Sequence, residues 1–142
     1  MTPRKRKRLI RPRNFLAQPL RRLVKQAVKT AEPAGREICG LLVDNGTLLE
    51  LVPMKNKSKA PGSFQLSWKK IKRAERAARR LGHRVVGTFH SHPASPAVPG
   101  PSDLEYACGD LMLIIACWDP DAKLWVIRKG KAEEVPYRTL EV

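Results

Sequence analysis

Apolar residues recur at three- and four-residue steps in two stretches of the chain, and this spacing predicts two amphipathic helices. The first helix is expected to begin near Pro19 and to end at Pro33, with a stripe made of Leu20, Leu23, Val24, Ala27, Val28 and Ala31. The second begins after Ser67, a favourable N-cap, and ends at Leu81, just before Gly82. Its stripe, expected to be buried, comprises Trp68, Ile71, Ala74, Ala78 and Leu81.

Short apolar runs bounded by turn residues predict β-strands between and after these helices. The runs at 38–43 and 47–52 flank Asp44-Asn45-Gly46, a strong hairpin signal, and their continuous apolarity predicts burial on both faces. Further strands are expected at 64–66, 83–89, 111–118, 124–128 and 132–140. Because Pro136 interrupts the last of them, that strand is expected at a sheet edge.

The remaining elements complete the expected fold. Ser102 is expected to open a short helix that runs to about Cys108, and Trp118 and Trp125 are expected in the core or packed across strands. The order helix, strands, helix, strands predicts an α/β sandwich around a mixed, mostly antiparallel sheet flanked by helices.

Length and composition narrow the class of protein. The chain has 142 residues, of which 42% are apolar, and this suits one globular domain. No apolar run approaches the ~18 to 20 residues of a membrane span, and no apolar stretch follows the basic first residues as in a secretory signal. Cys39, Cys108 and Cys117 are odd in number, widely spaced and in apolar surroundings, which predicts buried free thiols. We therefore expect a cytoplasmic protein without membrane contact.

The net charge of +15 is concentrated in two blocks. Residues 1–13 carry no acidic side chain, and residues 69–84 carry one, Glu75. We expect residues 1–14 to form a basic disordered tail and residues 15–142 to form the domain. Both blocks would attract a polyanion such as nucleic acid, although a solvated tail and a solvated helix face explain the same charges.

The densest candidate chemistry lies at His90-Ser91-His92, at the end of an apolar run that predicts a strand. Residues two apart on a strand project from the same face, so both imidazoles can reach one point. The proline-rich loop that follows can return a carboxylate to that point. Two imidazoles and a carboxylate are the donors of a catalytic Zn²⁺ site, with the fourth position left for water.

These residues resemble the pattern of the JAMM metalloproteases, the MPN-domain family. In that family a distant glutamate precedes His-x-His, which is followed by seven residues, a serine, two residues and an aspartate. The corresponding positions are Glu37, His90, His92 and Asp103, and Gly100 stands where the family has serine. The resemblance covers roughly residues 20–142.

The resemblance implies an MPN-like fold, which is also cytidine-deaminase-like. It implies a Zn²⁺ ion held by His90, His92 and Asp103, with Glu37 as the catalytic group that takes a proton from the water and passes it to the leaving amine. The implied reaction is hydrolysis of a peptide or isopeptide bond, at the C-terminal tail of a ubiquitin-like or sulfur-carrier protein. Because the family serine helps to stabilise the oxyanion, Gly100 also allows a catalytically weak or inactive MPN binding module, associated with nucleic acid through the basic tail and helix.

Three details stay open at this level. Glu105 also fits a ligand position after Ser102, but loop length favours Asp103 as the ligand and a capping box formed by Ser102 and Glu105. Glu37 is also compatible with an ordinary strand-edge carboxylate that pairs with Arg36 or another basic residue. The hydroxyl of Ser91 or Ser102 is a candidate replacement for the missing family serine.

Overall fold

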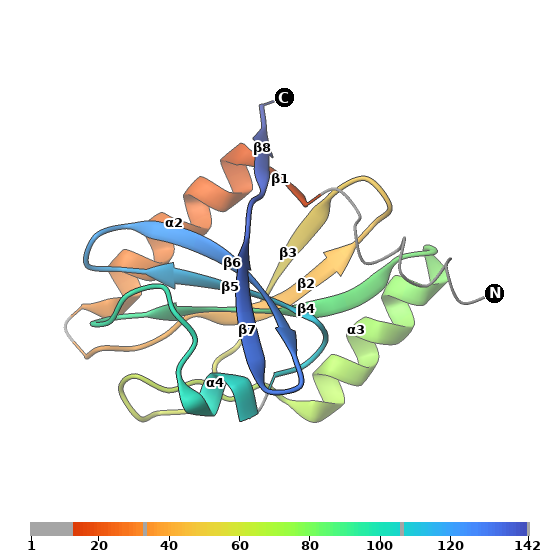
Figure 1. Cartoon of the computed structure of the whole chain (residues 1–142). Helices are drawn as coiled ribbons and strands as arrows, with labels where there is room; N and C mark the ends of the chain where they lie inside the picture. The colour runs from red at the N-terminus through yellow and green to blue at the C-terminus, as the bar shows by residue number, and fades with distance from the viewer. Residues whose placement is uncertain (1–12, 33, 106, 142) are drawn as a thin grey trace.

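The fold comes from a computed structural model that describes residues 13–32, 34–105 and 107–141. Its helices are α2 (Ala17–Ala31), α3 (Trp68–Arg80) and α4 (Pro101–Glu105). Its strands are β1 (Asn14–Leu16), β2 (Cys39–Asp44), β3 (Leu49–Met54), β4 (Arg84–His92), β5 (Leu111–Ala116), β6 (Asp121–Arg128), β7 (Lys131–Val135) and β8 (Arg138–Leu140) (Figure 1). Within these described residues, no helix is long and apolar enough to cross a membrane.

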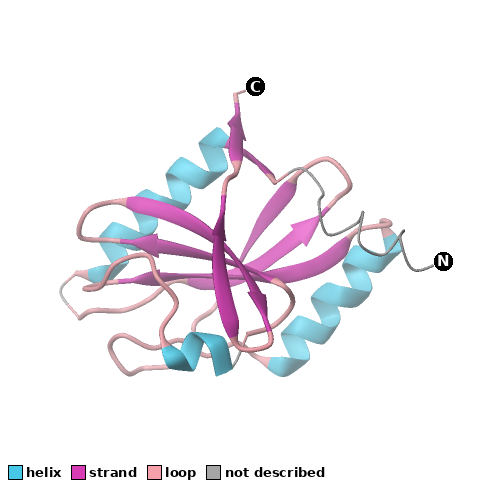
Figure 2. Cartoon of the chain, viewed as in Figure 1, coloured by secondary structure: helices cyan, strands magenta, loops and turns pink. Residues whose placement is uncertain are grey.

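Six strands form one sheet in the order β3-β2-β4-β5-β6-β7. Its neighbouring strands are antiparallel except for β4 and β5, which run parallel and are connected through α4. The helices flank this sheet, so the expected α/β architecture with a mixed, mostly antiparallel sheet is confirmed (Figure 2). A second sheet pairs β1 with β8 in parallel, at the top of Figure 1.

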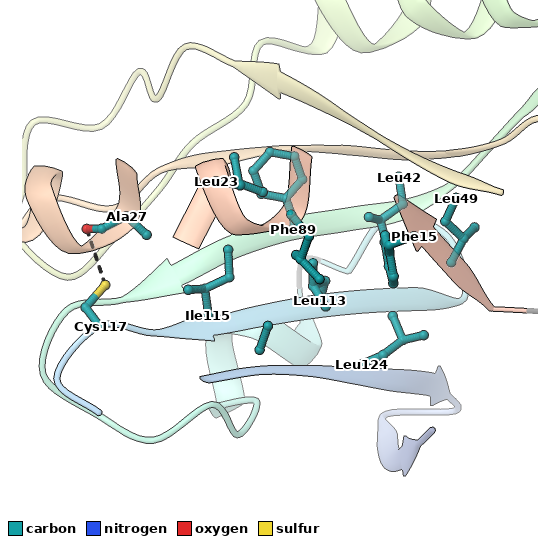
Figure 3. Close-up of a cluster of buried hydrophobic side chains, with 12 residues drawn as sticks. Phe15, Leu23, Ala27, Leu42, Leu49, Phe89, Leu113, Ile115, Cys117 and Leu124 are labelled. Carbon is teal, nitrogen blue, oxygen red and sulfur yellow. Dashed lines mark hydrogen bonds between the residues drawn. The ribbon is translucent and has the colours of Figure 1, made fainter. Parts of the chain in front are cut away.

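One face of the large sheet packs against α2. Leu23 and Ala27 of the helix lie over Phe89, Leu113 and other buried side chains of the strands (Figure 3). The thiol of Cys117 donates a hydrogen bond to the carbonyl oxygen of Ala27, at 3.4 Å. Gly40 faces the ring of Phe89, and a Cβ at this position would come within 2.3 Å of a ring carbon. The predicted apolar stripe of the first helix is therefore buried against this closely packed face of the sheet.

The opposite face is covered by the proline-rich loop and α4. Met112 and Ile114 of β5 pack there with Ala97 of the loop and Leu104 of α4. The indole of Trp125 donates a hydrogen bond to the carbonyl oxygen of Ala97, at 2.9 Å. The expected packing role of Trp125 is thus confirmed, and the contact holds the loop against the sheet.

Local signals placed several element ends correctly. The hydroxyl of Ser67 accepts a hydrogen bond from the backbone N–H of Lys70, at 3.3 Å, as expected of the N-cap of α3. Gly82 follows this helix with a φ of +74°, a conformation that favours glycine. The first helix begins two residues before Pro19, which lies in the first turn, where no intrahelical bond needs its missing N–H.

Three predicted core side chains are instead exposed, namely Trp68 at 67%, Leu81 at 71% and Trp118 at 89%. Trp68 and Leu81 lie at the two ends of α3, whose buried residues are Ile71 and Ala78. Trp118 lies beyond the end of β5, in the turn before β6. The predictions of burial for these three side chains are therefore wrong. Hydrophobic periodicity indicates the direction in which a side chain points, but not whether a neighbouring element extends far enough to cover it.

Other differences concern strand edges. Residues 64–66 form no strand, and the carbonyl oxygen of Gln65 accepts a hydrogen bond from the N–H of Lys57, at 2.9 Å. β3 is an edge strand with exposed positions, whereas β2 is buried along most of its length, so burial on both faces holds for β2 alone. Pro136 divides the last predicted strand into β7, at the sheet edge as expected, and β8.

The ends of the chain can be compared only in part with the expected tail. Residues 1–12 lie outside the described residues, whereas Asn14 belongs to β1. The next residue, Phe15, is fully buried and packs edge-on against Tyr137, with the ring centroids 5.3 Å apart. This contact joins the start of the domain to its C-terminal segment.

Candidate metal centre

The two histidines occupy the C-terminal end of β4, on the face opposite α2. His90 pairs with Ile114 and His92 with Ala116 of the parallel strand β5, and both partners belong to the core on that face. Ser91 lies between the histidines and therefore points to the other face. The two imidazoles are buried, with their Nε2 atoms 3.1 Å apart.

The carboxylate of Asp103 faces both rings from α4. Its Oδ1 lies 3.1 Å from Nε2 of His90, and its Oδ2 lies 3.1 Å from Nε2 of His92. Glu105, the other candidate from the sequence, is exposed. The structure therefore gathers His90, His92 and Asp103 into one cluster, with ligand atoms within 4.8 Å of one another.

The helix start that presents Asp103 differs from the one expected. α4 begins at Pro101, so Gly100 takes the N-cap position and its carbonyl oxygen accepts a hydrogen bond from the N–H of Leu104, at 3.1 Å. Asp103, at the third helical position, accepts from the N–H of Gly100 at 2.8 Å. This is one half of a capping box, two residues earlier in the chain than the predicted pair of Ser102 and Glu105. Proline is favoured at the first helical position, which sets the earlier register.

The hydrogen bonds of the cluster determine which ring nitrogen of His92 is available. Nδ1 of His92 lies 2.7 Å from the carbonyl oxygen of Pro96, which can only accept, so Nδ1 carries a proton. In the neutral ring Nε2 then presents a lone pair to the carboxylate of Asp103. Two acceptors at 3.1 Å repel each other unless a proton or a cation lies between them. The donor set and its tautomer therefore fit a bound divalent metal ion.

The close packing of the three side chains shifts their pKa values. Burial would raise the pKa of Asp103, but its hydrogen bonds with His90 and His92 hold that pKa far below the ordinary range. Burial lowers the pKa of His90. For His92 burial acts in the same direction, but the contacts with Asp103 and the Pro96 carbonyl outweigh it and raise the pKa. The carboxylate thus stays ionised, and positive charge is favoured beside it.

Glu37 lies two residues before β2 and is 5% exposed. Burial raises the pKa of its carboxyl to about 7, with a smaller lowering by His92 and a raising contribution from Asp103. Its Oε1 has no hydrogen-bond partner among the described residues. The guanidinium of Arg36 instead donates to the carbonyl oxygen of Ser58, at 3.4 Å, so the structure does not support the ion pair with Glu37.

Glu37, His92 and Asp103 line a common cleft of about 590 Å³, together with Gly35, Gly100 and Ser102. Ser91 is not part of that lining, because its hydroxyl accepts a hydrogen bond from the N–H of Ile38 on the other face, at 2.9 Å. This contact removes Ser91 as a replacement for the family serine. Ser102 remains at the exposed rim of the cleft.

The sequence did not predict three contacts made by His90, His92 and Glu37. Phe64 stacks on the ring of His90, with centroids 4.5 Å apart and an interplanar angle of 20°. The carbonyl of Pro96 fixes His92, and the side chain of Asn56 donates to the carbonyl oxygen of Glu37 at 2.9 Å. No local spacing rule predicts these contacts, since each depends on the path of a loop.

Together, the mixed sheet, the buried His-x-His at the end of a central strand and the acid returned by the next helix define a JAB/MPN-type domain. The comparison with known families agrees. Residues 17–129 match the family described as prokaryotic homologs of the JAB domain, and the chain belongs to this family.

Known proteins and structures resemble the chain at modest identity. A protein from Pyrococcus furiosus named Desampylase is 28% identical over 111 residues, which is 76% of this chain and 79% of that protein. The solution structure of a protein from Desulfitobacterium hafniense has a TM-score of 0.74 and 25% identity, with 91% and 93% of the two chains covered. A JAB1/MPN domain protein from Archaeoglobus fulgidus shares the fold, with a TM-score of 0.52, 24% identity and coverage of 84% and 94%.

Proposed function

We propose that the protein is a Zn²⁺-dependent hydrolase that cleaves a peptide or isopeptide bond. The observation that carries this proposal is the buried cluster of His90, His92 and Asp103, whose ligand atoms converge within 4.8 Å. Family membership and similarity to a protein named Desampylase support the same reaction class.

In the proposed site His90, His92 and Asp103 hold the metal ion. A Zn²⁺ ion bound by three protein ligands would supply an activated water and polarise the scissile carbonyl. The carbonyl of Pro96 keeps Nδ1 of His92 protonated, so that Nε2 is free to bind. The N–H of Gly100 holds one oxygen of Asp103 in place. The chain thus orients its own donors before any ligand binds.

Glu37 is the proposed proton carrier. It shares the cleft with His92 and Asp103, and a pKa of about 7 allows its carboxyl both to accept and to release a proton near neutral pH. Its unpartnered oxygen leaves an acceptor free for a water molecule. Glu37 would first take a proton from the attacking water and then deliver it to the leaving amine.

The proposed substrate is the C-terminal tail of a ubiquitin-like or sulfur-carrier protein, in the cytoplasm. The lining of the cleft beside the cluster includes Gly35, Gly62, Pro93 and Pro96. The two glycines carry no side chain, which permits close approach of a bound peptide. Support for this substrate class comes from the resemblance to the family and from the name of the relative.

The test begins with Zn²⁺ content, measured by mass spectrometry on protein purified without added metal. We expect about one Zn²⁺ per chain, and release of the tail from a linear fusion of a ubiquitin-like protein that stops on chelation and returns with Zn²⁺. A chain that binds Zn²⁺ but cleaves neither linear nor isopeptide-linked fusions would be the inactive binding module. A chain that binds no Zn²⁺ after reconstitution contradicts the proposed function.

A further inference from the structure

Asn56, two residues after β3, uses its whole amide group to organise the loop that follows. Its Nδ2 donates to the carbonyl oxygens of Glu37 at 2.9 Å and Ser63 at 3.1 Å. Its Oδ1 accepts from the N–H groups of Ser58 at 2.9 Å and Gln65 at 3.0 Å. Carbonyls can only accept and N–H groups only donate, so these partners fix which way the amide points.

The loop held by Asn56 delivers Phe64 to the metal centre. The Phe64 ring stacks on His90, while Nδ1 of His90 is buried without a hydrogen-bond partner among the described residues. A metal-binding histidine usually donates its second nitrogen to a carbonyl or carboxylate, which sets the plane of the ring. His92 follows this rule through Pro96, whereas His90 does not. The ring of Phe64 thus stacks on the imidazole that lacks this second hydrogen bond, a position from which it can set the plane of His90.

The same amide anchors the segment that carries Glu37. On the next residue, Ile38, the N–H donates to the hydroxyl of Ser91 at 2.9 Å and the carbonyl oxygen accepts from the N–H of Ser91 at 3.1 Å. The carbonyl of Glu37 itself is bound by Asn56. The backbone at Glu37 is thus held from β4 on one side and from the loop on the other.

We propose that Asn56 is a positioning residue for the site, acting on Glu37 through the backbone and on His90 through Phe64. The inference rests on the proposed function for its purpose, but the four hydrogen bonds of Asn56 involve none of the proposed metal-binding residues. Breaking the two donor bonds of Asn56 should loosen the Glu37 segment and free the ring of His90 at once. Partners of this kind typically affect metal affinity by about 10- to 100-fold.

Asn56→Asp is the sharpest perturbation, because it keeps the size of the side chain and both acceptor bonds while it turns the two donors into an oxygen facing two carbonyls. Asn45→Asp is the matched control. The side chain of Asn45 also accepts from two backbone N–H groups, those of Thr47 and Leu48, and its Nδ2 donates to the carboxylate of Glu50. Asn45 lies in the β2–β3 hairpin. Both full-length variants would be compared with the wild type.

Three readouts separate positioning from stability. The first is the Zn²⁺ dissociation constant, from competition with a chromophoric chelator. The second is the visible absorption spectrum of the Co²⁺-loaded protein, which reports ligand geometry. The third is amide hydrogen exchange at Ile38 and, as an internal reference, at Leu113 in the metal-free protein. For Asn56→Asp we expect a Zn²⁺ dissociation constant about 10- to 100-fold higher than in the wild type, together with an altered Co²⁺ spectrum. We also expect the rate of amide exchange to increase more at Ile38 than at Leu113, relative to the wild type. Asn45→Asp should match the wild type in all three.

An Asn56→Asp protein with wild-type Zn²⁺ affinity and Co²⁺ spectrum would overturn the inference, and so would exchange that rises equally at Ile38 and Leu113. If Asn56→Asp does not fold, Phe64→Leu decides, since it removes the stacked ring and should raise the Zn²⁺ dissociation constant about tenfold. An unchanged value would refute the role of the loop. If the wild type binds neither metal, the proposed function fails, and exchange at Ile38 still decides whether Asn56 positions Glu37.

Discussion

Replacement of Gly100 by serine tests whether the glycine limits catalysis. Gly100 is the N-cap residue of α4 and lines the cleft beside Asp103. The resemblance to the JAMM pattern places a serine at this position, where it helps to stabilise the oxyanion of the reaction. Gly100→Ser would restore that hydroxyl in a site that otherwise keeps both histidines and the aspartate.

The structure accommodates the added side chain. A Cβ at Gly100 would lie 3.7 Å from its nearest neighbour, Oδ2 of Asp103, which is an ordinary van der Waals distance. The N–H of Gly100 that holds Asp103 is kept in the variant. Replacing glycine where the backbone suits other residues stabilises a fold by about 0.4 to 1 kcal/mol. Serine at an N-cap adds a few tenths of a kcal/mol over glycine. We therefore expect no loss of stability.

The expected gain in rate is larger. An N-cap serine accepts a backbone N–H through its oxygen, while the hydroxyl hydrogen remains free to donate. One such donor to an oxyanion is worth roughly 10² to 10³ in kcat, which is the upper bound for Gly100→Ser. Gly100→Ala is the control, because it adds the Cβ and the backbone restriction without the hydroxyl.

The assay measures cleavage of a linear ubiquitin-like fusion and of its isopeptide-linked form under single-turnover conditions, at equal Zn²⁺ content. We expect Gly100→Ser to exceed both the wild type and Gly100→Ala by at least about tenfold, and by no more than the roughly 10² to 10³ that one donor can supply. Equal rates for the serine and alanine variants would refute the reasoning. The oxyanion would then be stabilised without a side chain at this position.

Three further predictions address the site and the core. Asp103→Ala should abolish Zn²⁺ binding while Glu105→Ala retains about one ion per chain, and metal analysis of both variants would detect the reverse. The raised pKa of Glu37 means that the metal-free fold holds this proton more tightly than the unfolded chain, so the contribution of Glu37 to stability is present below pH 4.5 and is lost as pH rises through about 7. In urea unfolding with a chelator present, the free energy of unfolding of the wild type should fall by about 3 kcal/mol over that pH range relative to Glu37→Gln. If the two proteins show the same dependence of this free energy on pH, the raised pKa of Glu37 is not the cause. Leu113→Ala, at a fully buried position under α2, should cost about 2 to 5 kcal/mol in the same assay, and a smaller loss would mean that the site collapses around the cavity.

Local patterns in the sequence account for much of the fold. Hydrophobic periodicity located the long helices, and the Asn45-Gly46 signal located the β2–β3 hairpin, because both depend on neighbours within a few residues. The same patterns did not predict the exposure of Trp68 and Trp118. Exposure depends on which distant strand lies under a residue, and no local spacing contains that information.

The candidate site divides in the same way. Alternation along a strand placed His90 and His92 on one face from their spacing alone, since the pleat repeats every two residues. The acid that meets them depends on where α4 begins, and Pro101 and Gly100 set that register so that Asp103 reaches both rings. Loop length favoured this residue, but the backbone contact from Gly100 became visible only in the fold.

The sequence by itself thus determined the order of the elements and the residue types gathered at the end of β4. Tertiary structure decided the environment that gives those residues their chemistry. The raised pKa of Glu37 comes from burial between segments that are distant in sequence, and the plane of His90 comes from Phe64 on a loop that Asn56 holds. The physical reason is that secondary structure follows from short-range spacing, whereas burial, electrostatic coupling and ring orientation arise only when distant segments pack together.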